Sequence, residues 1–141
     1  MLYIDTSVLA AYYCPEPLSE LAETKLRGTA SLVISDLTEL ELCSAIARKC
    51  RSGELPRQDA IKILSEFQAH ADTGRFRRHS LSAQNQQTAK EWLKQMEWPL
   101  RTLDALHLAI ASALDATILT ADTHMAQCAK GIGLSFQLLA R

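Results

Sequence analysis

Long apolar segments are absent from this chain of 141 residues. The longest nearly apolar stretch, residues 106–114, still contains His107 and Ser112. Because a membrane-spanning helix needs about 20 apolar residues, the sequence predicts no transmembrane segment and no membrane partner. The first residues also lack a basic stretch followed by a long apolar one, so no secretory signal is visible there. We therefore expect a cytoplasmic protein.

Closely spaced cysteines are lacking as well. The chain has four cysteines and no C-x-x-C pair, and the nearest two, Cys43 and Cys50, fall on one predicted helix. At that spacing they lie about 10 Å apart along the helix axis, which is too far for a disulfide. A composition of 48% hydrophobic and 22% charged residues fits an ordinary globular domain. We therefore expect one domain over residues 1–141, with Cys14, Cys43, Cys50 and Cys128 all buried as small hydrophobic side chains.

Glycine-rich nucleotide-binding motifs are also missing. The chain has only five glycines, and it contains no G-x-x-x-x-G-K-[ST] motif. Gly131-Ile132-Gly133 lacks the rest of a dinucleotide fingerprint, so the sequence argues against a nucleotide cofactor.

Short apolar runs alternate with segments of helical periodicity along the whole chain. We expect strands at residues 2–4, 31–35, 76–81, 117–120 and 135–139. We expect helices at residues 6–13, 18–27, 36–51, 56–74, 83–96, 102–114 and 122–130. This alternation predicts an α/β fold, an α/β/α sandwich with a central parallel sheet of four to five strands.

Two acidic residues follow predicted strands. Asp5 comes directly after the first strand, and Asp122 follows the fourth by way of Thr120. In a parallel sheet both positions face the rim where ligands bind, which makes them candidate metal ligands. The alternative is that each aspartate only caps the helix that follows it, a role that suits this residue type.

Two predicted helices carry further candidates. Asp104 lies in the first turn of its helix, at the flank of the stripe formed by Leu103, Leu106, Ile110 and Leu114, so we expect its carboxylate to be partly covered. The helix from Asp36 carries an apolar arc made of Leu40, Cys43, Ile46, Ala47 and Cys50. Asp36 and Glu39 resemble a capping box. Periodicity alone does not choose between Glu39 and Glu41 as the functional carboxylate.

Taken together, four segments resemble a PIN domain of the VapC toxin type. They are YIDTSVL at residues 3–9, SDLTELEL at 35–42, LDALHLA at 103–109 and ILTAD at 118–122. The resemblance covers essentially the whole chain. It implies that the acidic positions of the family correspond to Asp5, Glu41, Asp104 and Asp122, which favours Glu41 over Glu39. It also implies supporting hydroxyl groups at Thr6 or Ser7 and at Thr120, which would orient a water or the phosphate.

A cluster of four carboxylates has a physical consequence of its own. Two carboxylates about 5 Å apart repel by roughly 3 kcal/mol at an effective dielectric constant near 20, so the cluster calls for a cation. Oxygen ligands without cysteine or histidine motifs favour Mg²⁺ or Mn²⁺.

The resemblance implies a metal-dependent endoribonuclease that cuts single-stranded RNA or a tRNA loop. It further implies a homodimer that is neutralised by a cognate VapB-like antitoxin.

Other residues bear on RNA binding and on alternatives. His107 can reach the same rim, although a structural role is the simpler interpretation. Possible RNA contacts are the basic side chains Arg48, Arg75, Arg77 and Arg78.

Two other functions stay open, a magnesium-dependent phosphatase or phosphoacceptor and a catalytically silent PIN protein-binding module. The phosphatase class with a D-x-D motif is disfavoured because residue 7 is serine.

Positive and negative charges nearly cancel, since the chain has 15 lysines and arginines and 16 acidic residues. This balance argues against a broad basic surface for nucleic acid. If four of the acids lie in one pocket, however, the rest of the chain is mildly basic. We therefore expect an affinity for RNA that is modest and depends on the metal.

Overall fold

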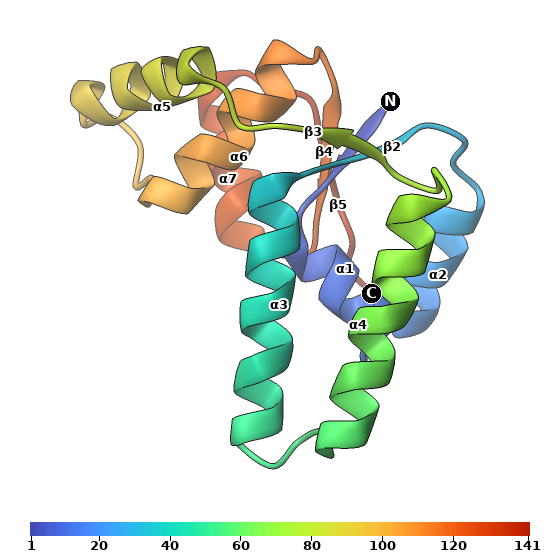
Figure 1. Cartoon of the computed structure of the whole chain (residues 1–141). Coiled ribbons are helices and arrows are strands. Elements are labelled where there is room, and N and C mark those ends of the chain that lie inside the picture. Colours follow the sequence, from blue (N-terminus) through green and yellow to red (C-terminus); the bar gives the residue numbers. More distant parts are fainter.

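The computed structural model describes all residues, Met1–Arg141, as a central sheet covered by helices on both faces (Figure 1). The strands are β1 (Leu2–Ile4), β2 (Leu32–Ser35), β3 (Arg77–His79), β4 (Thr117–Thr120) and β5 (Phe136–Leu138). The helices are α1 (Thr6–Tyr13), α2 (Ser19–Arg27), α3 (Asp36–Arg51), α4 (Arg57–Asp72), α5 (Ala83–Gln95), α6 (Thr102–Ala113) and α7 (Thr123–Ile132).

The sheet has the order β3-β2-β1-β4-β5, and every pair of neighbouring strands is parallel. The predicted parallel sheet is thereby confirmed. The first strand lies in the centre, where Tyr3 is in register with Val33 on one side and Ile118 on the other. The chain builds one half of the sheet outward from β1 and then returns to build the other half. The order therefore reverses beside β1, the point where open α/β sheets bind ligands.

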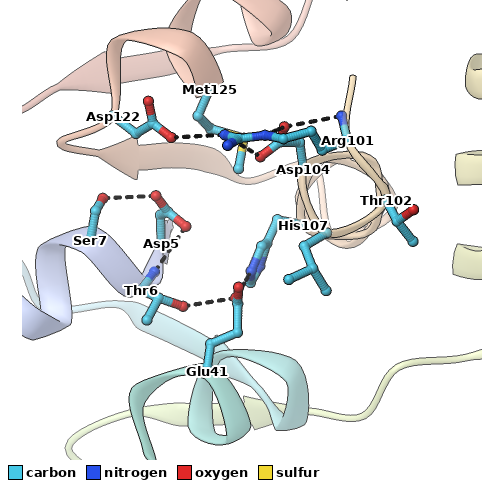
Figure 2. Close-up of a pocket in the computed structure, with 11 residues that line it drawn as sticks. Asp5, Thr6, Ser7, Glu41, Arg101, Thr102, Asp104, His107, Asp122 and Met125 are labelled. Atoms are coloured by element: carbon cyan, nitrogen blue, oxygen red, sulfur yellow. Dashed lines mark hydrogen bonds and ion pairs between the residues drawn. The ribbon is translucent and has the colours of Figure 1, made fainter. Parts of the chain in front are cut away.

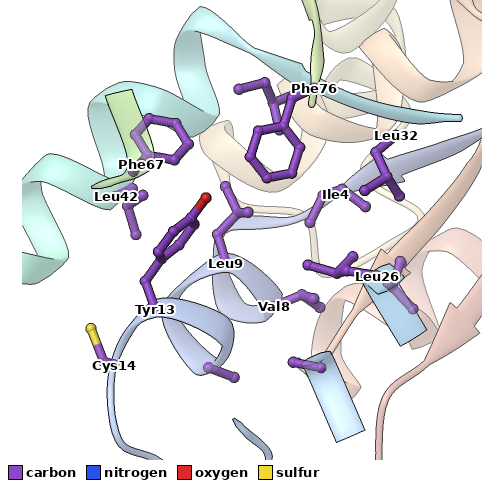
Figure 3. Packing of buried hydrophobic residues seen from close by; sticks show 14 of the residues in the cluster. Ile4, Val8, Leu9, Tyr13, Cys14, Leu26, Leu32, Leu42, Phe67 and Phe76 are labelled. Carbon is purple, nitrogen blue, oxygen red and sulfur yellow. The ribbon is translucent and has the colours of Figure 1, made fainter. Parts of the chain in front are cut away.

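Successive residues of a strand point to opposite faces of the sheet, and each face packs against its own hydrophobic core. On one face, Leu2 and Ile4 of β1 pack with the cluster contributed by α1 to α4. Figure 3 shows part of this cluster, in which the rings of Tyr13 and Phe67 meet edge to face at 5.5 Å between centroids. On the other face, Tyr3 packs with residues of α6 and α7. The predicted three-layer sandwich is confirmed.

The helix starts differ in detail from the prediction. Helix α3 is capped by Ser35, whose hydroxyl accepts from the backbone N–H of Thr38 at 3.2 Å, and not by Asp36 with Glu39. Helix α6 is capped at Arg101 and not at Thr102. At the other end of the chain, α7 closes at Gly133, where a φ of 93° suits glycine, and not at Gly131.

The apolar arc predicted for α3 was wrong in part. Ile46 is fully buried as expected, but Leu40 is 69% exposed, and Cys43 and Ala47 are exposed as well. The arc also omitted Leu42, which is fully buried. Contacts with α1 and α4 determine which face of α3 is buried. The sequence of α3 does not identify this face, because apolar side chains occur all around the helix.

The prediction of four buried cysteines fails for the same reason. Cys14 and Cys128 are buried, but Cys43 is exposed and Cys50 is only partly covered. The stripe predicted for α6 was also wrong in part, since Leu103 is 45% exposed while Asp104 is almost fully buried.

Strand β3 is shorter than expected and forms one edge of the sheet. Its residues Arg77 and Arg78 are exposed, and charged side chains on an edge strand discourage pairing with other chains. None of the helices combines the length and the hydropathy that a membrane crossing would require.

Candidate active site

The fold brings the four candidate acids to one rim of the sheet. Asp5 follows β1, and Asp122 follows the adjacent strand β4. Helix α3 starts where β2 ends, and α6 runs back toward the beginning of β4, so both helices have their first turns at the carboxyl ends of the strands. This arrangement places Glu41 and Asp104 on that rim as well (Figure 2).

The four side chains line a single pocket of about 460 Å³. Its other lining residues are Thr6, Ser7, Arg101, Thr102, Leu103, His107 and Met125. The structure therefore brings together Asp5, Glu41, Asp104 and Asp122, as expected. It also separates Glu41 from Glu39, whose carboxylate instead pairs with Arg78 at 2.8 Å.

Asp5 is buried and its carboxylate is held by three donors. The backbone N–H of Thr6 donates to Oδ1 at 2.9 Å, and the hydroxyls of Ser7 and Thr120 each donate to Oδ2 at 2.8 Å. Ser7 and Thr120 in turn accept from the backbone N–H groups of Ala121 and Asp122. Asp5 is thus both the cap of α1 and a fixed member of the pocket. The two interpretations of this residue are compatible.

The three hydroxyls that we expected beside the acids all contact them. Ser7 and Thr120 orient Asp5, and the Thr6 hydroxyl donates to Oε1 of Glu41 at 2.9 Å. These bonds fix the directions in which the carboxylate oxygens present their remaining lone pairs. That the hydroxyls orient a water or the phosphate stays a prediction.

Glu41 is linked to the protein interior through His107. His107 is almost fully buried, its Nε2 contacts Oε1 of Glu41, and its Nδ1 lies 2.6 Å from the hydroxyl of Tyr3. The Tyr3 hydroxyl also contacts the hydroxyls of Ser35 and Thr38 at 2.8 and 3.2 Å. A chain of polar contacts thus runs from the pocket to the buried start of α3.

The ionisation of these groups follows from their surroundings. Burial raises the pKa of Tyr3, so the phenol keeps its proton. Burial alone would raise the pKa of Glu41, but the hydrogen bond and charge of His107 and the Thr6 hydroxyl outweigh it, so this pKa lies below its ordinary value. A carboxylate can only accept, so Nε2 of His107 carries a proton, and in the neutral ring Nδ1 accepts from Tyr3.

Asp104 and Asp122 share a cation. The guanidinium of Arg101 donates to Asp104 at 2.9 Å through Nε and lies 3.5 Å from Asp122 through Nη2. Nε2 of His124 lies 3.4 Å from Oδ2 of Asp104. Asp122 itself caps α7 by accepting from the backbone N–H of His124 at 2.9 Å. As with Asp5, the capping role and the place in the pocket coexist.

The donor chemistry of the pocket fits a divalent cation of the magnesium type. Four carboxylates supply hard oxygen ligands, and no cysteine lines the pocket. In the structure, however, no three acidic, histidine or cysteine side chains converge closely enough to hold an ion. Arg101 instead neutralises Asp104 and Asp122, and His107 is hydrogen-bonded to Glu41. Coordination therefore requires the carboxylates to exchange these partners for the ion.

None of the candidate RNA-binding arginines lines this pocket. Arg78 pairs with Glu39 and Asp72, and Arg75 donates to the backbone carbonyl of Leu26 at 2.6 Å. Arg48 and Arg77 are exposed. A role for these four in RNA binding stays a prediction.

Sequence reasoning missed Arg101, which lines the pocket, and two residues behind the lining, His124 beside Asp104 and Tyr3 beside His107. Arg101 precedes Asp104 by one helical turn, and this spacing is the signal that could have identified an ion pair. No comparable signal exists for Tyr3, whose contacts with His107 and Ser35 depend on packing across the sheet.

Comparisons with known proteins agree with this architecture. The family model described as the PIN domain matches residues 2–131. Ribonuclease VapC3 of Pyrobaculum aerophilum is 25% identical over 126 residues, which are 89% of this chain and 92% of that protein.

Solved structures show the same fold at lower identity. VapC20 of Mycobacterium tuberculosis, described as a toxin that cleaves the sarcin-ricin loop, has a TM-score of 0.67 at 17% identity and covers 84% of this chain and 87% of its own. VapBC2 of Rickettsia felis, bound to a DNA fragment from its promoter, has a TM-score of 0.71 at 18% identity and covers 99% of this chain and 100% of its own. FitAcB of Neisseria gonorrhoeae has a TM-score of 0.71 at 19% identity and covers 96% of both chains. With a family match that extends from β1 through nearly all of α7, the chain belongs to the PIN domain family.

Proposed function

We propose that this protein is a metal-dependent endoribonuclease of the VapC type, the toxin of a toxin–antitoxin pair. The observation that carries the proposal is the convergence of Asp5, Glu41, Asp104 and Asp122 on one pocket at the switch point of a PIN fold. Similarity to Ribonuclease VapC3 supports the nuclease activity. The substrate class that we propose is single-stranded RNA or a tRNA loop, cut to leave a 5′-phosphate.

Asp5 and Asp104 would be the principal ligands of Mg²⁺ or Mn²⁺, with Glu41 and Asp122 completing the site directly or through waters. When bound, such an ion lowers the pKa of a water and stabilises the charge of the leaving oxygen. Ser7 and Thr120 keep the Asp5 carboxylate in a fixed orientation. His107 and Thr6 do the same for Glu41.

We also propose a cognate VapB-like antitoxin and a homodimer. The supporting observation is that solved relatives of this fold include VapBC2 of Rickettsia felis and VapBC-1 of nontypeable Haemophilus influenzae, both named as toxin–antitoxin pairs. A small partner gene next to the one encoding this chain would support the toxin role, and its absence would favour a housekeeping nuclease.

The direct test is cleavage of a labelled single-stranded RNA. We expect cleavage in Mg²⁺ or Mn²⁺, loss of cleavage in EDTA, and recovery when the metal is restored. Asp104→Asn should slow cleavage about 100-fold or more, because metal-assisted catalysis supplies several kcal/mol. An Asp104→Asn protein as active as the wild type would contradict the proposal. Asp122→Asn provides the same test if Asp104→Asn does not fold.

The same samples separate the two alternative functions. A phosphoacceptor would form a covalent aspartyl-phosphate at Asp5, which mass spectrometry after incubation with a phosphodonor detects. A silent binding module would show neither cleavage nor a rise in melting temperature with Mn²⁺. We expect no aspartyl-phosphate and a clear rise in melting temperature, because an ion that binds only the folded state stabilises it.

A further inference from the structure

Arg101 is the one lysine or arginine among the charged partners of the four acids. Its Nε lies 2.9 Å from Oδ2 of Asp104, and its Nη2 lies 3.5 Å from both Oδ1 of Asp104 and Oδ2 of Asp122. Figure 2 shows the guanidinium extending from α6 between these two carboxylates. It thus stands where a cation shared by Asp104 and Asp122 would stand.

The two partners differ in how firmly they are held. The Asp104 side chain is only 7% exposed, and its Oδ2 also accepts from the backbone N–H of Arg101 at 3.1 Å. The Arg101 side chain is 66% exposed and makes no hydrogen bond other than those to the two acids. Arg101 can therefore swing out while Asp104 stays in place.

A divalent cation and Arg101 compete for the same oxygens. Both are positively charged, and the guanidinium already contacts oxygens of Asp104 and Asp122, two residues that line the pocket. Like charges repel, and one lone pair cannot serve two cations. Occupation by the ion therefore requires Arg101 to leave.

A displaced Arg101 stays at the rim of the pocket, because its backbone is fixed as the cap of α6. Thr102 and Leu103 from the first turn of the same helix line the pocket beside it. The field at the amino end of a helix favours anions, and a guanidinium binds a phosphate through two parallel hydrogen bonds. In a nuclease, the anion that enters such a pocket is the backbone of the substrate.

On these grounds we propose that Arg101 is a phosphate-binding residue of the RNA site, held by Asp104 and Asp122 until a divalent cation takes their oxygens. This inference rests on the proposed nuclease function. It assigns Arg101 two successive partners. Before the ion binds, Arg101 neutralises the acids, and afterwards it contacts a phosphate of the RNA.

The test compares the wild type with Arg101→Ala, Arg101→Lys and the control Arg27→Ala. Arg27 is exposed, pairs only with Glu23 on α2, and lies outside the pocket, so its removal changes the net charge equally. Isothermal titration with Mn²⁺ measures the first role without any turnover. We expect Arg101→Ala to bind Mn²⁺ about two- to tenfold more tightly at low ionic strength, since one competing ion pair is removed. Added salt should narrow this difference.

Steady-state cleavage of a mixed-sequence RNA measures the second role. Arg101→Ala should raise KM roughly tenfold with a smaller change in kcat, as expected for loss of a charged hydrogen bond to the substrate. Arg101→Lys should bind Mn²⁺ about as tightly as the wild type, because it keeps the positive charge. Its KM should lie between those of the wild type and Arg101→Ala, because lysine cannot form the two parallel hydrogen bonds of a guanidinium. Arg27→Ala should match the wild type in both.

Two results would overturn the inference while leaving the nuclease function intact. One is an Arg101→Ala protein whose Mn²⁺ affinity is unchanged or weaker, and the other is a KM equal to that of the wild type. A wild-type protein that neither binds Mn²⁺ nor cuts RNA would overturn the proposed function, and this inference with it. Thermal melting of each variant shows whether it is folded.

Discussion

The acids in the pocket are held by neighbours of three kinds: hydroxyl groups, a histidine and an arginine. Asp5 accepts from the Ser7 and Thr120 hydroxyls, Glu41 contacts His107, and Asp104 pairs with Arg101. Hydroxyl donors leave the charge of a carboxylate in place, whereas Arg101 cancels it. We infer that Asp5 is the acid most ready to receive a cation and that Asp104 and Asp122 must first release their partner.

The sequence places the acids at the rim and points to hydroxyl groups and His107 nearby, but it does not reveal which acid each one contacts. Asp5 and Asp122 could be predicted because each lies within two residues of the end of a strand. The selection of Glu41 over Glu39 needed the family resemblance, since both positions fit the helical pattern. The link from Glu41 through His107 to Tyr3 joins residues far apart in the chain, and no local spacing encodes it.

Glu41 predicts a pH dependence of folding in the presence of EDTA. Its pKa in the folded protein is lower than the ordinary value of 4.5. Its contribution to the free energy of unfolding is therefore complete above pH 4.5 and is lost as the pH falls through the lower, folded pKa. At neutral pH, Glu41→Gln should be less stable than the wild type by about 1–3 kcal/mol.

Urea unfolding between pH 3 and pH 7 measures this effect, because these limits bracket the ordinary pKa of 4.5. The gap in unfolding free energy between wild type and Glu41→Gln should shrink as the pH is lowered. A gap that stays constant or widens toward acid would show that the Glu41 carboxylate is not stabilised by His107 and Thr6.

At the scale of elements, the amphipathic helices were the least predictable part. The existence and order of all twelve helices and strands followed from apolar runs and turn residues. The buried face of α3 did not, because apolar side chains on it point in several directions and only the contacts with α1 and α4 decide which are covered. The edge strand β3 was hard to delimit because its residues are charged.

Helix α3 offers a matched pair of substitutions that tests its orientation. Leu42 is fully buried in the core of α1 to α4, whereas Leu40, two residues earlier, is 69% exposed. Leu42→Ala should lower the free energy of unfolding by about 2–5 kcal/mol through loss of burial and an added cavity. Leu40→Ala should change it by less than about 0.5 kcal/mol. Equal costs in chemical denaturation would mean that α3 is rotated about its axis.

At the scale of the whole molecule, the strand order creates the pocket. Strand β1 lies between β2 and β4. The carboxyl ends of these three strands therefore lie at one rim of the sheet, and the first turn of α6 lies at the same rim. Four of the 16 acidic side chains lie there, so the other acids are outnumbered by the 15 lysines and arginines of the chain. The near-neutral total charge of the chain therefore does not argue against the RNA affinity that we propose.

The central claim is that the acidic pocket cuts RNA with the help of a divalent ion. Asp5→Asn tests it most directly, because asparagine also caps helices well and keeps one oxygen acceptor, so the fold should persist. We predict that single-turnover cleavage of a single-stranded RNA in Mn²⁺ falls about 100-fold or more in Asp5→Asn, while thermal melting in EDTA shows that the variant is still folded. A folded Asp5→Asn protein that cleaves this RNA at the wild-type rate would contradict the account.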